Sequence, residues 1–337
     1  TEKKQKGSVL FCSEFYGGKM KKAYVKDIVK EYDIAYYNQE TPTGDDSIAY
    51  SGYPMFYTPS AYVDAMRAVG FNTVSLASNH SLDKGEKGIL NTVKYFKTTD
   101  ILYNGMSDSE TDRNNFIIKE KNNITYTMLS YTTITNGLNV PAGKSYLLNK
   151  YDKEQVKKDI EAVRDKVDVL IVAMHWGVEY INMPNDEEKE IAEYLSSLGD
   201  DIVIGNHPHI LQPITKIGDT IVMYSLGNFI SNQYGGSNGD WNKLIGFMAT
   251  LDITKNVTKD NEVNMTFDNL GGELIFTKYK GNPVTTAVHS GHTVIPFSKM
   301  TDDSYLKDYE RLYNKYTGVL KSLGQDLNIA PIGSRAN

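Results

Sequence analysis

The sequence has almost no cysteine. Cys12 is the single cysteine among 337 residues, which excludes an intrachain disulfide and a zinc site built from several thiolates. It ends the apolar run 9–12, so we expect a small, buried hydrophobic side chain at this position. So little cysteine does not identify the redox compartment in which the protein works.

Long hydrophobic runs and basic blocks are absent as well. No apolar stretch reaches the ~18–20 residues that cross a bilayer, and we find no signal peptide. The formal net charge is −6, and no basic block is long enough to follow a phosphate backbone, so we do not expect a nucleic-acid partner. The chain begins at Thr1 without an initiator methionine, which is typical of a processed or trimmed protein.

The composition is that of an ordinary globular protein, with 40% hydrophobic and 23% charged residues. In the first two-thirds, short apolar runs alternate with amphipathic stretches. The predicted strands are 8–14, 33–38, 72–77, 124–131, 167–174 and 200–204. The predicted helices between them are 21–32, 59–69, 85–98, 152–165 and 186–198. Strands separated by helices of this length predict a layered α/β fold with buried sheets.

The pattern changes after residue 205. The runs 210–217 and 220–225 flank Gly218-Asp219, which predicts a hairpin. Further strands are predicted at 244–253, 262–268, 272–279 and 284–288, followed by a helix near 302–322. We expect one domain over residues 1–337, in which residues 245–337 complete the second sheet and add the C-terminal helix.

Residues of metal-ligand type follow several of the predicted strands. They are Glu14, Glu40 with Asn38 before it, Asn79 and His80 with Asp83 close behind, His175, and His207 and His209 in an NHPH run. Because ligands of α/β sheets bind outside the carboxyl ends of strands, five such ends on one rim could supply two metal ions. Imidazole, carboxylate and amide donors without thiolate suit Mn, Fe, Zn or similar ions.

Each of these signals also has an ordinary structural explanation. A single histidine after an apolar strand is more often structural than a ligand, and Asn79-His80 also suits the turn and cap of the next helix. His207 and His209, separated by a proline that restricts the backbone, are the sharper signal. Four of the six histidines follow predicted strands, which favours a shared site over coincidence.

Several longer motifs occur in a characteristic order. They are 38–41, 70–85, 168–180 with HWGVEY, 199–212 with IGNHPHILQP, and 224–229 with YSLGNF. In these motifs the sequence resembles the bacterial capsule-synthesis CapA family (poly-γ-glutamate biosynthesis protein CapA/PgsA), a branch similar to the calcineurin-like metallophosphoesterases. The resemblance covers roughly residues 8–232. It implies a four-layer αββα sandwich, in which two packed sheets are flanked by helices and a metal site lies at one edge.

The same resemblance assigns roles to individual residues. Two divalent ions are implied, with Glu40 between them. One ion would be held by Asn79, His175 and His207, and the other by Glu14 and His209. His80 would protonate a leaving group, and Asp83 would orient His80. The residues expected to line the site are Asn38, Trp176, Glu179 and Asn228.

The sequence departs from the family pattern at the end of the first strand. Ser13-Glu14 stands where Gly-Asp is common, and Tyr16 stands where the superfamily usually has histidine. Ser78 also stands where a second Asn often precedes Asn79, which is a milder change. These departures predict that the ion held by Glu14 and His209 binds weakly or is absent. A site with one metal ion and a site with none are therefore alternatives.

The resemblance implies a capsule or poly-γ-glutamate biosynthesis protein with a metallophosphoesterase-like site, and we expect a metal-dependent hydrolase. The alternative is a non-catalytic accessory of a capsule synthesis or export complex, and a less favoured one is a phosphatase or nucleotidase. The expected partners are an anionic polymer such as poly-γ-glutamate, a phosphorylated or polysaccharide substrate, and membrane-bound subunits of a synthesis complex. We expect an extracytoplasmic protein at the cell surface, membrane-anchored through a preceding N-terminal segment.

Three further segments lie outside these motifs. His289 and His292 have a spacing suited to a metal, but a surface loop is the favoured interpretation. The aromatic, proline-rich stretch 53–59 is expected to pack in the core, with a platform beside the site as the alternative. The glycine-rich stretch 234–240 could be a flap or an exposed loop.

Overall fold

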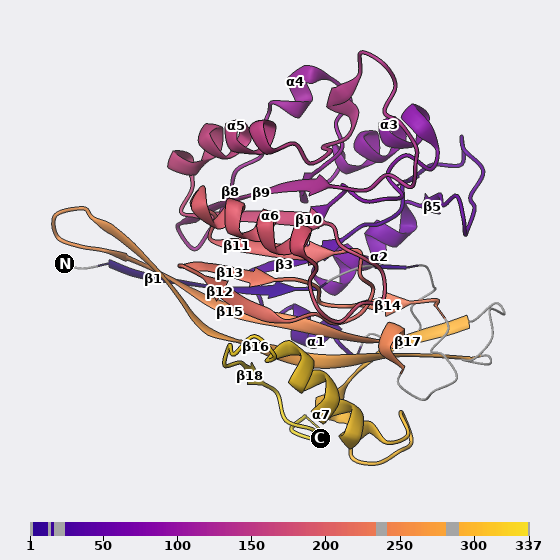
Figure 1. The fold of residues 1–337 in the computed structure, drawn as a ribbon, viewed down its shortest axis with the longest axis vertical. Helices are drawn as coiled ribbons and strands as arrows, with labels where there is room; N and C mark the ends of the chain where they lie inside the picture. The colour runs from indigo at the N-terminus through magenta and orange to yellow at the C-terminus, as the bar shows by residue number, and fades with distance from the viewer. Residues whose placement is uncertain (1–2, 13–14, 17–23, 234–240, 281–289, 336–337) are drawn as a thin grey trace.

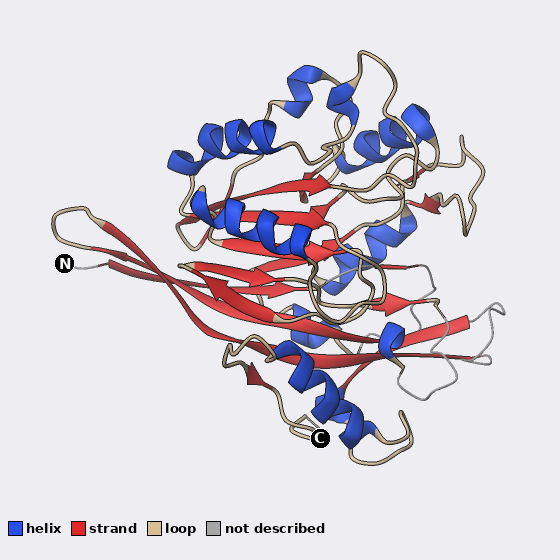
Figure 2. Cartoon of the chain, in the orientation of Figure 1, coloured by secondary structure: helices blue, strands red, loops and turns tan. Residues whose placement is uncertain are grey.

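The computed structural model describes residues 3–12, 15–16, 24–233, 241–280 and 290–335. Their two large sheets lie face to face (Figures 1 and 2). The eight-stranded sheet has the order β17 (Ser290–Pro296), β16 (Val263–Lys280), β15 (Ile245–Val257), β1 (Lys3–Phe11), β3 (Ile34–Asn38), β6 (Thr73–Ser75) and β7 (Leu102–Asn104), with β18 (Asn328–Ile329) beside β16. The six-stranded sheet has the order β12 (Ile214–Ile217), β13 (Thr220–Met223), β11 (Ile202–Asn206), β10 (Val169–His175), β9 (Ile124–Thr132) and β8 (Lys119–Lys121).

Helices cover both outer faces of this pair of sheets. The helices are α1 (Lys26–Val29), α2 (Ala61–Val69), α3 (Gly85–Phe96), α4 (Glu110–Arg113), α5 (Lys153–Val163), α6 (Asp186–Ser197) and α7 (Tyr309–Leu320). Residues of α1, α2 and α3 share one buried hydrophobic cluster with the eight-stranded sheet. Residues of α5 and α6 share another with the six-stranded sheet. The order helix, sheet, sheet, helix confirms the predicted four-layer αββα sandwich.

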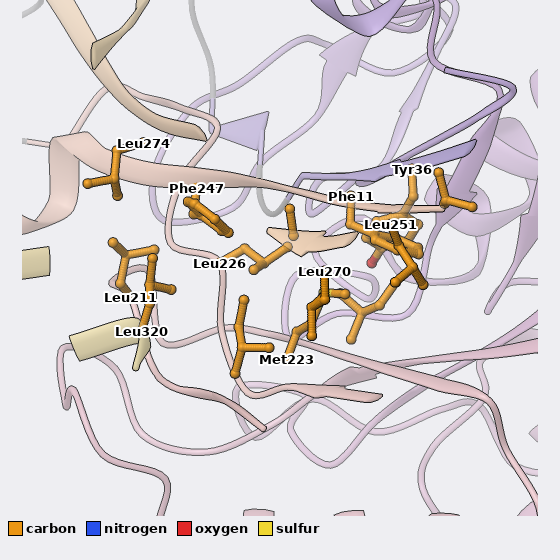
Figure 3. Packing of buried hydrophobic residues seen from close by; sticks show 14 of the residues in the cluster. Phe11, Tyr36, Leu211, Met223, Leu226, Phe247, Leu251, Leu270, Leu274 and Leu320 are labelled. Atoms are coloured by element: carbon orange, nitrogen blue, oxygen red, sulfur yellow. The ribbon is translucent and has the colours of Figure 1, made fainter. Parts of the chain in front are cut away.

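The central core fills the space between the two sheets. Phe11 and Tyr36 of the eight-stranded sheet share this cluster with Met223 of the six-stranded sheet (Figure 3). Leu320 of α7 belongs to the same cluster, so the C-terminal helix packs against the central core. Burial of this much apolar surface is the main stabilising contribution to such a fold.

Strands β1, β3, β6 and β7 are parallel to one another, as are β9, β10, β11 and β13. Their carboxyl ends therefore form one edge in each sheet, where α/β folds place their ligands. Strand β15 runs antiparallel to β1, pairing Lys3 with Val257 and Phe11 with Ala249. The residues after 245 thus extend the sheet that the N-terminal strands form. Cys12 is fully buried next to β1, as predicted.

Most predicted elements are present within a few residues of their expected positions, including the hairpin of β12 and β13. One prediction is wrong: the runs 262–268 and 272–279 form a single strand, β16. The glycines between them do not break the strand. A side chain at Gly271 would overlap the backbone of Asn328, and one at Gly272 the backbone of Met248, so glycine allows neighbouring strands to approach. The last helix begins at Tyr309, seven residues later than predicted (309 − 302). The predicted strand 284–288 lies outside the described residues.

Within the described ranges, none of the helices combines the length and the hydrophobicity that crossing a membrane requires.

The start of α6 provides a prediction for the pH dependence of stability. Asn185 Oδ1 accepts from Glu188 N at 2.9 Å, and Glu188 Oε2 accepts from Asn185 N at 2.8 Å. Burial raises the pKa of Glu188 to about 6. The folded protein therefore holds the proton of Glu188 more tightly than the unfolded chain does. The free energy of unfolding falls as the pH rises toward and through 6, because Glu188 ionises in its buried position. We expect Glu188→Gln to raise the free energy of unfolding at pH 8 by about 1–2 kcal/mol. Thermal unfolding at pH 5 and pH 8 measures this effect.

The matched control is Glu187→Gln, which removes a charge from the same helical turn. We expect this control to leave the difference in unfolding temperature between pH 5 and pH 8 as it is in the wild type. A Glu188→Gln variant that is less stable than the wild type at both pH values contradicts the explanation from burial.

Candidate functional site

Four strand ends bring six predicted site residues to one edge of the sandwich. Glu40 follows β3, Asn79 and His80 follow β6, His175 ends β10, and His207 and His209 follow β11. We call these six residues the strand-end cluster. Each of them is 7% exposed or less. Burial of so many polar side chains is costly unless they interact with one another or with a ligand.

A chain of hydrogen bonds beneath the cluster joins the two sheets. Asn206 Nδ2 donates to Tyr36 Oη at 3.0 Å, and Tyr36 Oη lies 2.8 Å from Ser75 Oγ. Ser75 Oγ in turn donates to Asn38 Oδ1 at 2.5 Å. Asn38, expected to line the site, is fully buried in this network and supports the cluster from below. The network fixes the relative position of the two sheet edges that carry the cluster.

One half of the cluster contains Asn79, His175 and His207. His175 Nε2 lies 3.1 Å from Asn79 Oδ1, and the rings of His175 and His207 lie 4.9 Å apart. Burial, reinforced by the neighbouring histidines, holds the pKa of His175 well below its usual range. His175 is therefore a neutral imidazole, the form of histidine that binds metals.

The other half of the cluster centres on His209. Its Nε2 lies 3.7 Å from Glu40 Oε1 and 3.6 Å from Glu179 Oε1. Its Nδ1 lies 3.1 Å from Asn228 Oδ1, and Asn228 Nδ2 donates to the carbonyl oxygen of Lys243 at 2.9 Å. A hydrogen bond to Asn228 fixes the ring so that Nε2 faces the two carboxylates.

The backbone of the NHPH motif is strained. His207 and His209 have positive φ values of 99° and 60°. Residues with a β-carbon seldom adopt this region, and such strain is concentrated at functional sites. The conformation turns two imidazoles from one short segment toward different parts of the cluster, with ring centres 6.2 Å apart.

His80 and Asp83 form a pair, as the resemblance implies. His80 Nδ1 lies 2.8 Å from Asp83 Oδ2, which also accepts from Phe56 N at 2.7 Å. Burial lowers the pKa of His80, but the bond to Asp83 and the charge of Glu40 outweigh it, so the pKa is raised. The Phe56 ring packs edge-on against His80, with ring centres 4.7 Å apart.

Two aromatic contacts of the cluster were not predicted as part of the site. Phe56 belongs to the stretch 53–59, in which Tyr57 is buried but Tyr53 is 80% exposed, so only part of the stretch packs in the core. Tyr180 follows Glu179 directly and stacks on His209, with ring centres 5.9 Å apart. Its position at the end of the HWGVEY motif could have indicated this contact.

Some predicted residues lie elsewhere. Trp176 is fully buried among the hydrophobic residues that α5 and α6 cover, and its Nε1 donates to Tyr224 O at 3.1 Å, so it packs in the core instead of lining the cluster. Glu14 lies outside the described residues, as do His289 and the stretch 234–240. His292 was expected in a surface loop, but it is buried on β17, with Nε2 3.0 Å from Asn232 Oδ1.

The donors of the cluster suit a divalent ion in their chemistry, because they are imidazole, carboxylate and amide groups. These donors approach one another in pairs: His175 lies against Asn79, and His209 lies against Glu40. In the described part of the chain, however, no three His, Cys, Asp or Glu side chains are placed to hold a metal ion together.

Comparisons with known proteins identify a family and several relatives. The sequence model of the bacterial capsule synthesis protein family PGA_cap matches residues 3–233. Capsule biosynthesis protein CapA of Bacillus anthracis is 31% identical over 175 residues, which cover 51% of this chain and 43% of that protein. PGA biosynthesis protein CapA of Bacillus subtilis (strain 168) is 31% identical over 179 residues, which cover 51% of this chain and 45% of that protein. The matched segment is thus less than half the length of these relatives.

Two solved structures are also similar to the chain. A hypothetical protein from Thermus thermophilus has 14% identity and a TM-score of 0.46, over 79% of this chain and 99% of that one. The NAD nucleotidase NadN of Haemophilus influenzae has 13% identity and a TM-score of 0.48, over 96% of this chain and 69% of that one.

Proposed function

This chain belongs to the bacterial capsule synthesis protein family PGA_cap, and we propose that it is a metal-dependent hydrolase acting in capsule or poly-γ-glutamate synthesis. The observation that carries the proposal is the strand-end cluster, in which four histidines, Glu40 and Asn79 come together in a buried position from four strands. Burying so many polar side chains costs folding free energy, which a purely structural core would avoid by using apolar residues. Clustered, perturbed titratable groups are typical of active sites.

The proposed cofactor is a pair of divalent ions, such as Mn, Fe or Zn. Asn79, His175 and His207 would hold one ion, Glu40 would lie between the two, and His209 with Glu14 would hold the other. A bound divalent ion polarises an oxygen of the substrate and stabilises the negative charge that develops on it. His209 Nε2 lies 3.7 Å from Glu40 Oε1, so these two proposed ligands already face each other.

His80 is the residue that we propose to deliver a proton to the leaving group. Its Nδ1 faces Asp83, so its Nε2 is the ring nitrogen that can approach a substrate. Asp83 is held in turn by Phe56 N, which fixes the orientation of the imidazole. The Glu179 side chain is 42% exposed beside the buried His209, and we propose that it contacts the substrate.

The proposed substrates are an anionic polymer such as poly-γ-glutamate or a phosphorylated or polysaccharide chain, and the proposed location is the cell surface. The names of the two CapA relatives support this setting. We also propose membrane-bound subunits of a synthesis complex as partners. One observation favours a second function, a non-catalytic accessory: Ser13-Glu14 stands where the family commonly has Gly-Asp.

Metal analysis separates these two functions. We expect the purified wild type to retain one to two equivalents of a transition metal after dialysis, measured by plasma mass spectrometry. We expect His207→Ala and Glu40→Ala to bind Mn²⁺ at least about 100-fold more weakly in calorimetric titrations, because each removes a proposed ligand. Hydrolysis of a generic phosphodiester and of γ-glutamyl polymer is assayed alongside.

The matched control is His292→Ala, which removes another buried histidine that lies outside the cluster. This control is expected to bind metal as the wild type does. A wild type without metal and without hydrolysis under any condition overturns the hydrolase proposal and supports the accessory function.

A further inference from the structure

A cavity of about 460 Å³ lies beside the carboxyl end of β9, separate from the strand-end cluster. Residues of α4, of the segment 140–150 and of the start of α5 line it. The volume is in the range of small-molecule sites, roughly 300–1,000 Å³. The backbone connects the cavity to the cluster, because Thr132 N donates to Asn149 O at 3.0 Å and Thr133 N donates to His175 O at 3.0 Å.

Arg113 places a fixed guanidinium in the wall of this cavity. Its side chain is 10% exposed and binds Asp159 through two nitrogens, at 3.4 Å and 2.5 Å. Asp159 is held in addition by Tyr131 Oη at 2.7 Å and Gln155 Nε2 at 2.8 Å. A guanidinium has five N–H donors, so three remain after this pairing. A cation that is fixed and has donors to spare is suited to bind a carboxylate.

Asn149 adds a second unusual polar group to the wall. The residue is 3% exposed, and its Nδ2 donates to Asn104 Oδ1 at 3.0 Å. Its Oδ1 is buried and has no hydrogen-bond partner among the described residues. Leaving a buried acceptor unsatisfied costs free energy that a donor from a bound molecule would recover.

The remaining charges of the cavity are of both signs. Lys150 adds a cation, whereas Glu110 and Asp152 add two carboxylates, and all three are exposed at the opening. A ligand with a single negative charge would meet these carboxylates. A ligand with a single positive charge would meet the ammonium of Lys150, and the charge of Arg113 is already paired with Asp159. A molecule that carries both charges avoids both repulsions.

We propose that this cavity binds a small zwitterion, an amino acid or a dipeptide. The ligand carboxylate contacts Arg113 and Lys150, and the ligand ammonium contacts Glu110 and Asp152. The apolar part of the ligand lies against Val140, Tyr146 and Leu148, which complete the lining. This site does not depend on the proposed hydrolase function, because none of its residues belongs to the strand-end cluster.

Three matched probes test the requirement for both charges in the full chain. The probes are L-leucine, 4-methylpentanoate, which lacks the ammonium, and 3-methylbutylamine, which lacks the carboxylate. Titration calorimetry, or saturation-transfer NMR for weak binding, gives the dissociation constants. We expect L-leucine to bind at least tenfold more tightly than either analogue. Equal binding of the three probes, or no binding of L-leucine, overturns the proposal.

Variants at the opening locate the binding site without disturbing the core. We expect Lys150→Met and Glu110→Gln each to weaken L-leucine binding at least fivefold, because both residues are exposed and line the cavity. The matched controls are Lys153→Met and Glu154→Gln, on the first turn of α5 but not in the lining, and they are expected to bind as the wild type does. His207→Ala is also expected to retain L-leucine binding. If the lining variants and the controls bind equally well, the ligand is not in this cavity.

Discussion

The variant His80→Asn is expected to hydrolyse substrate about 10²–10⁴-fold more slowly than the wild type while retaining its metal. A proton donor contributes about this factor to hydrolysis, since an unprotonated leaving group departs slowly. Asparagine is the informative replacement, because its Nδ2 can donate to Asp83 in place of His80 Nδ1, which lies 2.8 Å from Asp83 Oδ2. The structure around Asp83 should therefore be preserved. Steady-state kinetics and metal analysis of the same preparation measure the two effects.

The pattern of kinetic constants distinguishes a proton donor from a structural residue. We expect kcat to fall and KM to change little, because protonation of the leaving group occurs only in the transition state. Asp83→Asn should cause a smaller loss, since Asp83 acts through His80. His292→Asn, which alters a buried histidine outside the cluster, should leave the activity unchanged. A His80→Asn variant with wild-type kcat, or one that loses its metal, removes His80 from the proposed mechanism.

The strand-end positions of the cluster could be predicted because hydrophobic periodicity and ligand chemistry agree at the same residues. Apolar runs end at His175 and Asn206, and in a parallel sheet such ends share one edge. The contact between His175 and Asn79, separated by 96 residues in the chain, needs more than this rule, because β10 and β6 belong to different sheets and their edges meet only through the packing of the two sheets. The pairing of His80 with Asp83 was expected from the family resemblance, and the structure places His80 Nδ1 2.8 Å from Asp83 Oδ2.

Other features depend on tertiary packing that periodicity does not encode. Trp176 lies just beyond the last residue of β10, and whether a side chain there turns into the core depends on what packs against it. Its ring lies among the hydrophobic residues that α5 and α6 cover. Phe56 reaches the cluster from a loop whose path depends on its surroundings. The positive φ values of His207 and His209 are likewise invisible in the sequence, because neither residue is glycine.

Gly205→Ala, two residues before His207, is expected to destabilise the fold severely. Gly205 lies in β11, where an added β-carbon would overlap the carbonyl oxygen of Tyr224 and the indole nitrogen of Trp176. These two groups hydrogen-bond to each other at 3.1 Å, so the methyl group would separate them. Overpacking of a buried position costs about 1–3 kcal/mol, and more where backbone must move. We expect a loss of at least about 3 kcal/mol, measured as a lower thermal unfolding temperature and less soluble protein.

Gly318→Ala makes the same chemical change where the outcome should be opposite. Gly318 lies within α7, and apart from its chain neighbours and the helix backbone no atom of the described residues is within 4 Å of the added β-carbon. Alanine should therefore stabilise the helix by about 0.5–1 kcal/mol. The comparison also separates folding from chemistry, because Gly205→Ala should lose metal, hydrolysis and L-leucine binding together, whereas His80→Asn should lose hydrolysis alone. Such a joint loss follows if β11 must pack against Tyr224 before His207 and His209 can reach the cluster. A Gly205→Ala protein that unfolds at the wild-type temperature would show that this strand end tolerates a side chain and that the glycine serves another purpose.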